Sequence, residues 1–196
     1  VSLGNRYYFG DGFRRNYARA AYWYQEAAKQ NDPIGLKNYG DMLASGQGVK
    51  KDSERAKEMY TRAIELFNYD AALPLAELYA RAKGSKRDYA KAVKYYELAY
   101  VYNDDPYAAY QYADLISQGK GVAAPDHNKA AKAFEFSASN EYLPGILKAG
   151  EYYLKGIGVN KDNEKALRYY LIASELGNEE ASIIVNIIRR SMEFNY

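Results

Sequence analysis

An alanine recurs at a nearly constant interval along this chain, and this feature constrains the fold more than any other. The alanines are Ala20, Ala56, Ala92, Ala130 and Ala166, separated by 36, 36, 38 and 36 residues. A period of this length is typical of solenoids in which each repeat is a pair of helices that packs on its neighbours. The spacing therefore predicts a repeat architecture for nearly the whole chain.

Two further columns keep register with the alanine and identify its element as a helix. An aromatic residue stands four positions after each alanine, and a small residue stands seven positions after it. The columns read Tyr24, Tyr60, Tyr96, Phe134 and Tyr170, then Ala27, Ala63, Ala99, Ser137 and Ala173. Positions i, i+4 and i+7 share one face of an α-helix. We therefore expect one helix per repeat with this face buried, and we name it helix B.

The residues before helix B predict how that helix begins. Four positions before the alanine stand Asn16, Asp52, Asp88, Asp126 and Asp162, whose side-chain oxygens can accept from the free amides of a first helical turn. We expect N-caps and not metal ligands, because no carboxylate cluster accompanies them. Glycine pairs precede the caps, as in Gly156-Ile157-Gly158, and predict tight chain reversals. They lack the strand and the further residues of a phosphate-binding loop.

A second helix, helix A, is predicted before each glycine pair. It carries a small residue where helix B approaches, and a large residue follows three positions later. The small column reads Gly4, Gly40, Ala76, Ala113 and Gly150. Pro33, Pro106 and Pro144 stand near the starts of three such helices, where a missing amide costs little. Pro74 does not fit this column, so we expect the third helix A to start late or to bend.

These patterns predict an all-α superhelical solenoid, with residues 1–196 as a single domain. The repeats cover approximately residues 1–32, 33–69, 70–104, 105–142 and 143–178, and a capping helix covers 179–194. We expect the capping helix to bury Ile183, Ile184, Ile187 and Ile188; an exposed stripe would be a surface for a partner or for self-association. The first helix A is short, so we expect that the N-terminus is truncated.

Composition removes several classes of function. The formal net charge is +2 and the basic residues are scattered, so we expect no nucleic-acid partner. Cysteine is absent and His127 is the one histidine, which leaves little for thiolate sites, zinc sites or histidine-based catalysis. No apolar run is long enough for a transmembrane segment. We expect no catalytic residues, no metal, no cofactor and no enzyme activity.

The repeat pattern resembles the Sel-one-like repeat (SLR), a relative of the tetratricopeptide repeat, over nearly the whole chain. In the fifth repeat the matching residues are Gly150, Tyr153, Gly156, Gly158, Val159, Asp162, Lys165, Ala166, Tyr169, Tyr170, Ala173, Gly177, Asn178 and Ala181. The resemblance implies an adaptor or scaffold that binds another protein or peptide. It is compatible with bacterial envelope, secretion, motor and toxin-immunity systems and with membrane-associated quality control, and it favours an exported location in the periplasm or secretory lumen.

The resemblance also implies a concave groove lined by the A helices, with the residue after the small position pointing into it. That column reads Asn5, Asp41, Glu77, Asp114 and Glu151, an acidic ladder that would steer a basic peptide. Further predicted groove residues are Tyr8, Lys37, Tyr110, Arg81 and Lys155. The alternative explanation is that acidic residues suit the first half of a helix. Self-assembly through the solenoid ends is the alternative function.

The chain contains 23 tyrosines, several of them in adjacent pairs such as Tyr95-Tyr96 and Tyr152-Tyr153. We expect one ring of each pair to fill the space between helices and the other to lie at its edge, with its hydroxyl in water. Exposed tyrosines would then be available as anchors at an interface.

Overall fold

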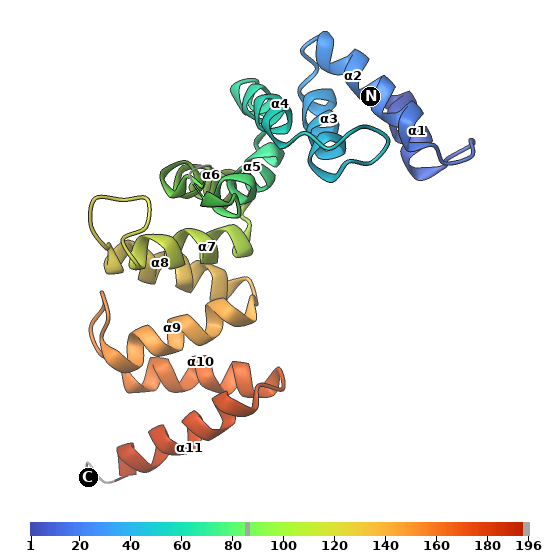
Figure 1. The fold of residues 1–196 in the computed structure, drawn as a ribbon. Coiled ribbons are helices and arrows are strands. Elements are labelled where there is room, and N and C mark those ends of the chain that lie inside the picture. The colour runs from blue at the N-terminus through green and yellow to red at the C-terminus, as the bar shows by residue number, and fades with distance from the viewer. Residues whose placement is uncertain (85–86, 194–196) are drawn as a thin grey trace. The chain divides into compact units, whose positions relative to one another are not determined.

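The computed structural model describes residues 1–84 and 87–193, and these residues form α-helices and no strand (Figure 1). The elements are α1 (Ser2–Phe9), α2 (Tyr17–Lys29), α3 (Pro33–Ser45), α4 (Ser53–Glu65), the 3₁₀ turn η1 (Tyr69–Ala71), α5 (Ala72–Ala80), α6 (Tyr89–Asn103), α7 (Pro106–Ser117), α8 (His127–Ser139), α9 (Leu143–Lys155), α10 (Asn163–Glu175) and α11 (Glu179–Glu193). Odd-numbered helices up to α9 are A helices and even-numbered ones are B helices. The predicted all-α class, with five helical pairs and a last helix, is confirmed.

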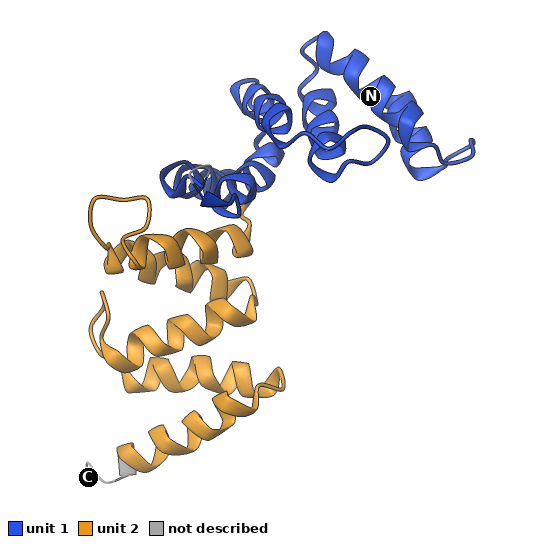
Figure 2. Cartoon of the chain, viewed as in Figure 1, with its two compact units in different colours: residues 1–103 blue, residues 104–196 orange. Residues whose placement is uncertain are grey.

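The chain divides into two compact units (Figure 2). Unit 1 is Val1–Asn103 and holds α1 to α6, while unit 2 is Asp104–Tyr196 and holds α7 to α11. Within unit 2, Figure 1 shows α7 to α11 stacked in chain order, so that each helix packs on the next. Unit 1 thus contains three helical pairs, and unit 2 contains two pairs and the last helix.

The buried columns of helix B are those that the period predicts. All five repeat alanines are 0% exposed, and the five aromatics that follow them are at most 5% exposed. Helix A approaches these rings closely: a Cβ added at Gly4 would lie 2.5 Å from the ring of Tyr24, and one added at Gly40 would lie 2.6 Å from that of Tyr60. The small column therefore sets the distance between the two helices of a repeat.

The predicted N-caps are confirmed in all five repeats. Each Asn or Asp side chain accepts a hydrogen bond from the backbone amide three residues later, at 2.8 to 3.1 Å. Pro33 and Pro106 occupy the first residue of α3 and α7, and Pro144 the second of α9. The third helix A starts late, as Pro74 predicts: η1 precedes α5, and α5 begins only at Ala72.

The prediction for tyrosine pairs is wrong at Tyr95 and Tyr96. Both rings are buried, at 8% and 2% exposure. The ring of Tyr95 is covered because it stacks on Tyr79 of α5, with centroids 5.9 Å apart and an interplanar angle of 10°. In the pair Tyr152 and Tyr153, by contrast, the first ring is buried and the second half-buried, as predicted, although the Tyr153 hydroxyl donates to Glu135 of α8.

The buried stripe predicted for the last helix is also wrong in part. α11 buries Ala181, Val185 and Ile188, while Ile183 and Ile187 are 61% and 60% exposed. The N-terminal cap explains the rotation of the helix: the Asn178 side chain accepts from the amide of Ala181, which places this alanine against α10. Residue 194, the predicted end of this helix, lies outside the described residues.

Candidate protein-binding face

The predicted groove residues lie on A helices or, for Arg81, directly after one, and they are half-buried or exposed. Unit 1 carries Tyr8 on α1, Lys37 and Asp41 on α3, Glu77 on α5, and Arg81 directly after it; unit 2 carries Tyr110 and Asp114 on α7, and Glu151 and Lys155 on α9. The hydroxyl of Tyr8 donates to Gln47 Oε1 at 3.3 Å, across to the loop after α3. The column is therefore accessible within each unit.

In unit 1 the ladder residues also anchor the aromatic column of helix B. The Tyr60 hydroxyl donates to Asp41 Oδ1 at 2.8 Å, and the Tyr24 hydroxyl donates in the same way to Asn5 Oδ1 at 2.8 Å. Burial, with Asp41 nearby, raises the pKa of Tyr60. Burial raises the pKa of Tyr24 to about 12. Both phenols thus stay protonated and hold the polar residue of helix A in place.

In unit 2 the ladder residue Glu151 lies between two lysines of its own helix. Lys148 Nζ approaches one carboxylate oxygen at 2.8 Å and Lys155 Nζ approaches the other at 2.7 Å. Burial alone would raise the pKa of Glu151, but the hydrogen bonds from the two lysines outweigh burial and lower this pKa. The carboxylate is therefore ionised and already has two cationic partners.

The other ladder carboxylates follow a similar rule. Asp41 pairs with Lys37 at 2.8 Å, and Glu77 pairs with Arg81 at 2.8 Å. Asp114 has no ion pair among the described residues. Because three of the four carboxylates have a cation on or next to their own helix, the column is close to charge-balanced within each unit. The steering of a basic peptide stays a prediction.

A groove in unit 2 brings three of the predicted residues together. It has a volume of about 490 Å³ and is lined by Tyr110, Leu143, Pro144, Leu147, Lys148, Glu151, Leu154, Lys155, Tyr170, Glu180 and Ile184. Side chains from α7, α9, α10 and α11 contribute, and most of them are apolar. The charged members are Lys148, Glu151, Lys155 and Glu180, two of each sign. An apolar floor with a polar rim is the usual composition of a protein-binding site.

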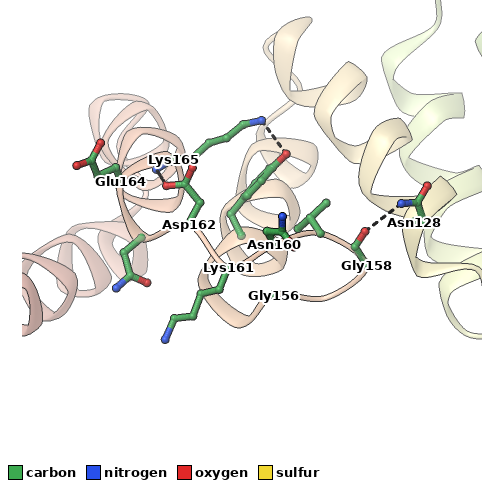
Figure 3. A pocket seen from close by; sticks show the side chains of 11 residues that line it. Asn128, Gly156, Gly158, Asn160, Lys161, Asp162, Glu164 and Lys165 are labelled. Atoms are coloured by element: carbon green, nitrogen blue, oxygen red, sulfur yellow. Dashed lines mark hydrogen bonds between the residues drawn. The ribbon is translucent and has the colours of Figure 1, made fainter.

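A larger hollow of about 1160 Å³ lies over the loop between α9 and α10 (Figure 3). Three of its polar groups serve the fold: Asp162 caps α10, Lys165 pairs with Glu135 of α8, and Asn128 Nδ2 donates to the carbonyl of Gly158 at 3.3 Å. The Oδ1 atom of Asn163 is buried and has no hydrogen-bond partner within the described residues. We therefore take the groove, and not this hollow, as the candidate site.

One set of contacts was missed by sequence reasoning although the sequence carries its signal. In three repeats the basic residue before the repeat alanine lies over the tyrosine of helix A. The pairs are Arg19 with Tyr7 at 5.4 Å, Lys91 with Tyr79 at 5.1 Å and Lys165 with Tyr153 at 4.0 Å to the ring centroid. In the other two repeats Leu43 and Ile116 replace the tyrosine. These cation–π contacts tie helix B to helix A.

No group of three or more side chains that could hold a metal ion is present in the described part of the chain. The Nδ1 atom of His127 lies 3.5 Å from the hydroxyl oxygen of Tyr152. Ser117 and Lys120 have S-x-x-K spacing, but the Ser117 hydroxyl donates to the carbonyl of Asp114 in its own helix at 2.9 Å. Among the described helices, none combines the length and apolarity that a membrane crossing needs.

Repeated helical pairs with capped B helices, glycine turns and an accessible A face define a solenoid of the protein-binding repeat class. The Sel1 repeat model matches residues 2–32, 33–66, 70–100, 106–140 and 144–178. The chain therefore belongs to the Sel1 repeat family, as the sequence pattern indicated.

Similar proteins come from bacteria and eukaryotes. The structure of c5321, a protective antigen of uropathogenic Escherichia coli with an SLR fold, is 28% identical with a TM-score of 0.85, and the match covers 95% of this chain and 40% of that one. Chitin synthase regulatory factor 3 of Schizosaccharomyces pombe is 28% identical over 88% of this chain. The ERAD-associated E3 ubiquitin-protein ligase component HRD3B of Arabidopsis thaliana is 30% identical over 68% of this chain. The chain spans 19% of the length of each of these two curated relatives.

Proposed function

We propose that this chain is a protein-interaction adaptor that holds a segment of a partner protein on its A-helix face, and that it has no enzyme activity. Two relatives support this class of function by name, one as a regulatory factor and one as a component of a ubiquitin ligase. The chain's own residues support it as well, because the accessible side chains of the A helices form a continuous column within each unit while the B helices supply the packing.

The groove in unit 2 is the proposed contact site, and its composition defines the partner. Leu147 and Leu154 of α9 and Ile184 of α11 form an apolar floor, while Lys148, Glu151, Lys155 and Glu180 form a rim with charges of both signs. A volume of about 490 Å³ accommodates a few side chains and not a folded domain. The partner segment is therefore a short stretch with apolar anchors and flanking polar groups. This group of apolar side chains, bordered by charged side chains of both signs, is the observation that carries the proposal.

A basic segment is the second form of the same proposal. It rests on Asp114, the ladder carboxylate without an ion pair in the described structure, which lies on α7 as Tyr110 does. Burial raises the pKa of Tyr110, and Asp114 adds to this effect. A partner cation placed near Asp114 would meet a carboxylate without an ion pair in the described structure, whereas at Glu151 it would compete with two lysines.

Site-specific photo-crosslinking tests the location of the site. A photoreactive amino acid at position 147 samples the groove floor, and the same residue at position 172 is the control, because Ile172 is an exposed apolar residue of α10 that does not line the groove. The partner captured from position 147 is identified and purified. Its identity also places the chain in one of the pathways that the family resemblance allows.

Binding of the purified partner then separates the two forms of the proposal. We expect Leu147→Glu to weaken binding at least tenfold, by roughly 1.4 kcal/mol or more, while Ile172→Glu leaves it unchanged. A basic segment would instead respond to Asp114→Asn and lose affinity as salt is added. Equal crosslinking from positions 147 and 172, or unchanged affinity in all three variants, would remove the groove from consideration.

A further inference from the structure

α11 leaves one apolar face uncovered on the side opposite its buried residues. Ile183 and Ile187 are 61% and 60% exposed and stand one turn apart, so they share a face of the helix. The buried residues Ala181, Val185 and Ile188 lie on the other side of the helix. Two isoleucines side by side and exposed on a regular helix are a typical feature of an interaction surface.

The register of α11 shows that one of these isoleucines, Ile187, replaces a polar residue of the earlier A helices. The amide of Ala181 donates to the N-cap side chain of α11, as the amide of Gly35 does in α3. Ile187 stands six residues after Ala181, and Asp41 stands six residues after Gly35. Ile187 therefore occupies the ladder position, at which Glu151 stands in α9. The A-helix face changes from charged to apolar at this helix.

Charged residues at the two ends of the same face indicate which kind of partner binds it. Glu179 and Glu180 precede the isoleucines by about one turn, and Arg190 follows them by about one turn, so all three share the stripe. All three side chains are exposed, and none makes an ion pair within the described structure. The stripe is thus acidic at its N-terminal end, apolar in the middle and basic at its C-terminal end.

We propose that this stripe, defined by Glu179, Glu180, Ile183, Ile187 and Arg190, pairs with the same stripe of a second copy in an antiparallel helix pair. A two-fold axis at the level of Val185 places Ile183 opposite Ile187 of the other copy. The same axis places Glu180 opposite Arg190 of the other copy, so both ends form ion pairs. The surface is self-complementary only in this direction, as an isologous interface requires.

The pairing is weak and depends on concentration and salt. The stripe from residue 179 to residue 190 is roughly 16 Å long, which is about three turns of helix and short for a stable interface. The ion pairs lie at the rim in water, where salt screens them. We expect monomer and dimer to exchange in the micromolar to millimolar range, with the dimer fraction falling as salt increases. This inference does not depend on the proposed partner binding.

Analytical ultracentrifugation of the full chain over that concentration range tests the pairing. The wild-type mass should rise from the 22.2 kDa monomer toward twice that value. Ile183→Glu with Ile187→Glu should remain monomeric throughout, whereas Ile172→Glu, a matched change on exposed apolar surface of α10, should dimerise normally. A wild-type chain that remains monomeric at millimolar concentration overturns the proposal.

Charge reversal tests the antiparallel direction. Arg190→Glu should weaken the dimer at least tenfold, and so should Glu179→Lys with Glu180→Lys. All three changes in one chain should restore it, because the ends are again opposite in sign. Arg189→Glu is the matched control, since Arg189 is exposed on another face of the same helix. Failure of the triple variant to recover, or an equal loss in the Arg189 variant, contradicts the antiparallel model, and circular dichroism verifies that each variant is folded.

Discussion

The glycine at position 158 connects two neighbouring repeats, and its substitution tests how the repeats are stacked. Gly158 has φ +65°, and a Cβ added there would lie well under 3.0 Å from the backbone carbonyl of His127, the first residue of α8. Gly177 has φ +86°, but a Cβ there would meet nothing within 4 Å. Both glycines adopt left-handed backbone, and only the first lies against another repeat.

The expected magnitudes follow from this difference. Alanine in a left-handed conformation costs about 1–2 kcal/mol, and the reduced entropy of the unfolded chain returns about 0.4–1 kcal/mol of this. Gly177→Ala should therefore destabilise unit 2 by about 1 kcal/mol or less. Gly158→Ala carries the same cost and in addition about 1–3 kcal/mol for the forced contact with α8. The two variants should differ by about 2 kcal/mol.

Urea unfolding followed by circular dichroism measures the difference in the free energy of unfolding, and hydrogen exchange locates it. Lost protection in Gly158→Ala should concentrate at the start of α8 and in the loop between α9 and α10. Gly48 and Gly84 provide the same comparison in unit 1, because a Cβ at Gly48 would meet the Tyr17 backbone and one at Gly84 would meet nothing within 4 Å. If Gly158→Ala and Gly177→Ala agree to within about 0.5 kcal/mol, inter-repeat contact at this glycine is not a determinant of stability.

Three further changes have defined outcomes. Phe67→Asn should stabilise unit 1 by roughly 0.5 kcal/mol in urea unfolding, because Phe67 has φ +63° and is 81% exposed, and asparagine tolerates this conformation as Asn31 does. Tyr170→Phe should reduce the loss of stability between pH 10 and 12, since burial, with Glu151 nearby, raises the pKa of Tyr170 to about 12 in the folded chain, while the unfolded phenol ionises from about pH 10. Asp162→Ala should cost about 1 kcal/mol in thermal unfolding, and Asp162→Asn should cost little because asparagine also caps.

Much of the fold follows from columns that the sequence displays directly. The repeat alanine and its aromatic neighbour can be assigned to a buried face because the period, the helical spacing and the cap all agree. The N-caps were predictable for the same reason, since the interval from Asp162 to Ala166 recurs in every repeat. Where several local signals point to one structure, the prediction and the structure agree.

The candidate site was only partly predictable. Asp41 was correctly placed on the A face, but its bond from Tyr60 joins residues 19 positions apart, and spacing within one helix does not predict it. The pairing of Asp41 with Lys37 was readable, because opposite charges four residues apart on a helix interact. Considering the carboxylates as one column, without their helical neighbours, overstated the acidity of the face.

The last helix shows why a hydrophobic pattern alone can assign the wrong face. The four isoleucines at 183, 184, 187 and 188 are compatible with two rotations of α11 about its axis. Moving the buried position by one residue turns the buried face by about 100°. Hydrophobicity does not decide between these rotations, but the N-cap does. The side chain of Asn178 accepts from the amide of Ala181 and fixes the first turn, so that Ala181 packs on α10. The energetic preference is for the smallest residue at the closest approach of two helices. Ile187 must then stand where other repeats carry a carboxylate, and its exposure is a consequence of register and not of poor packing.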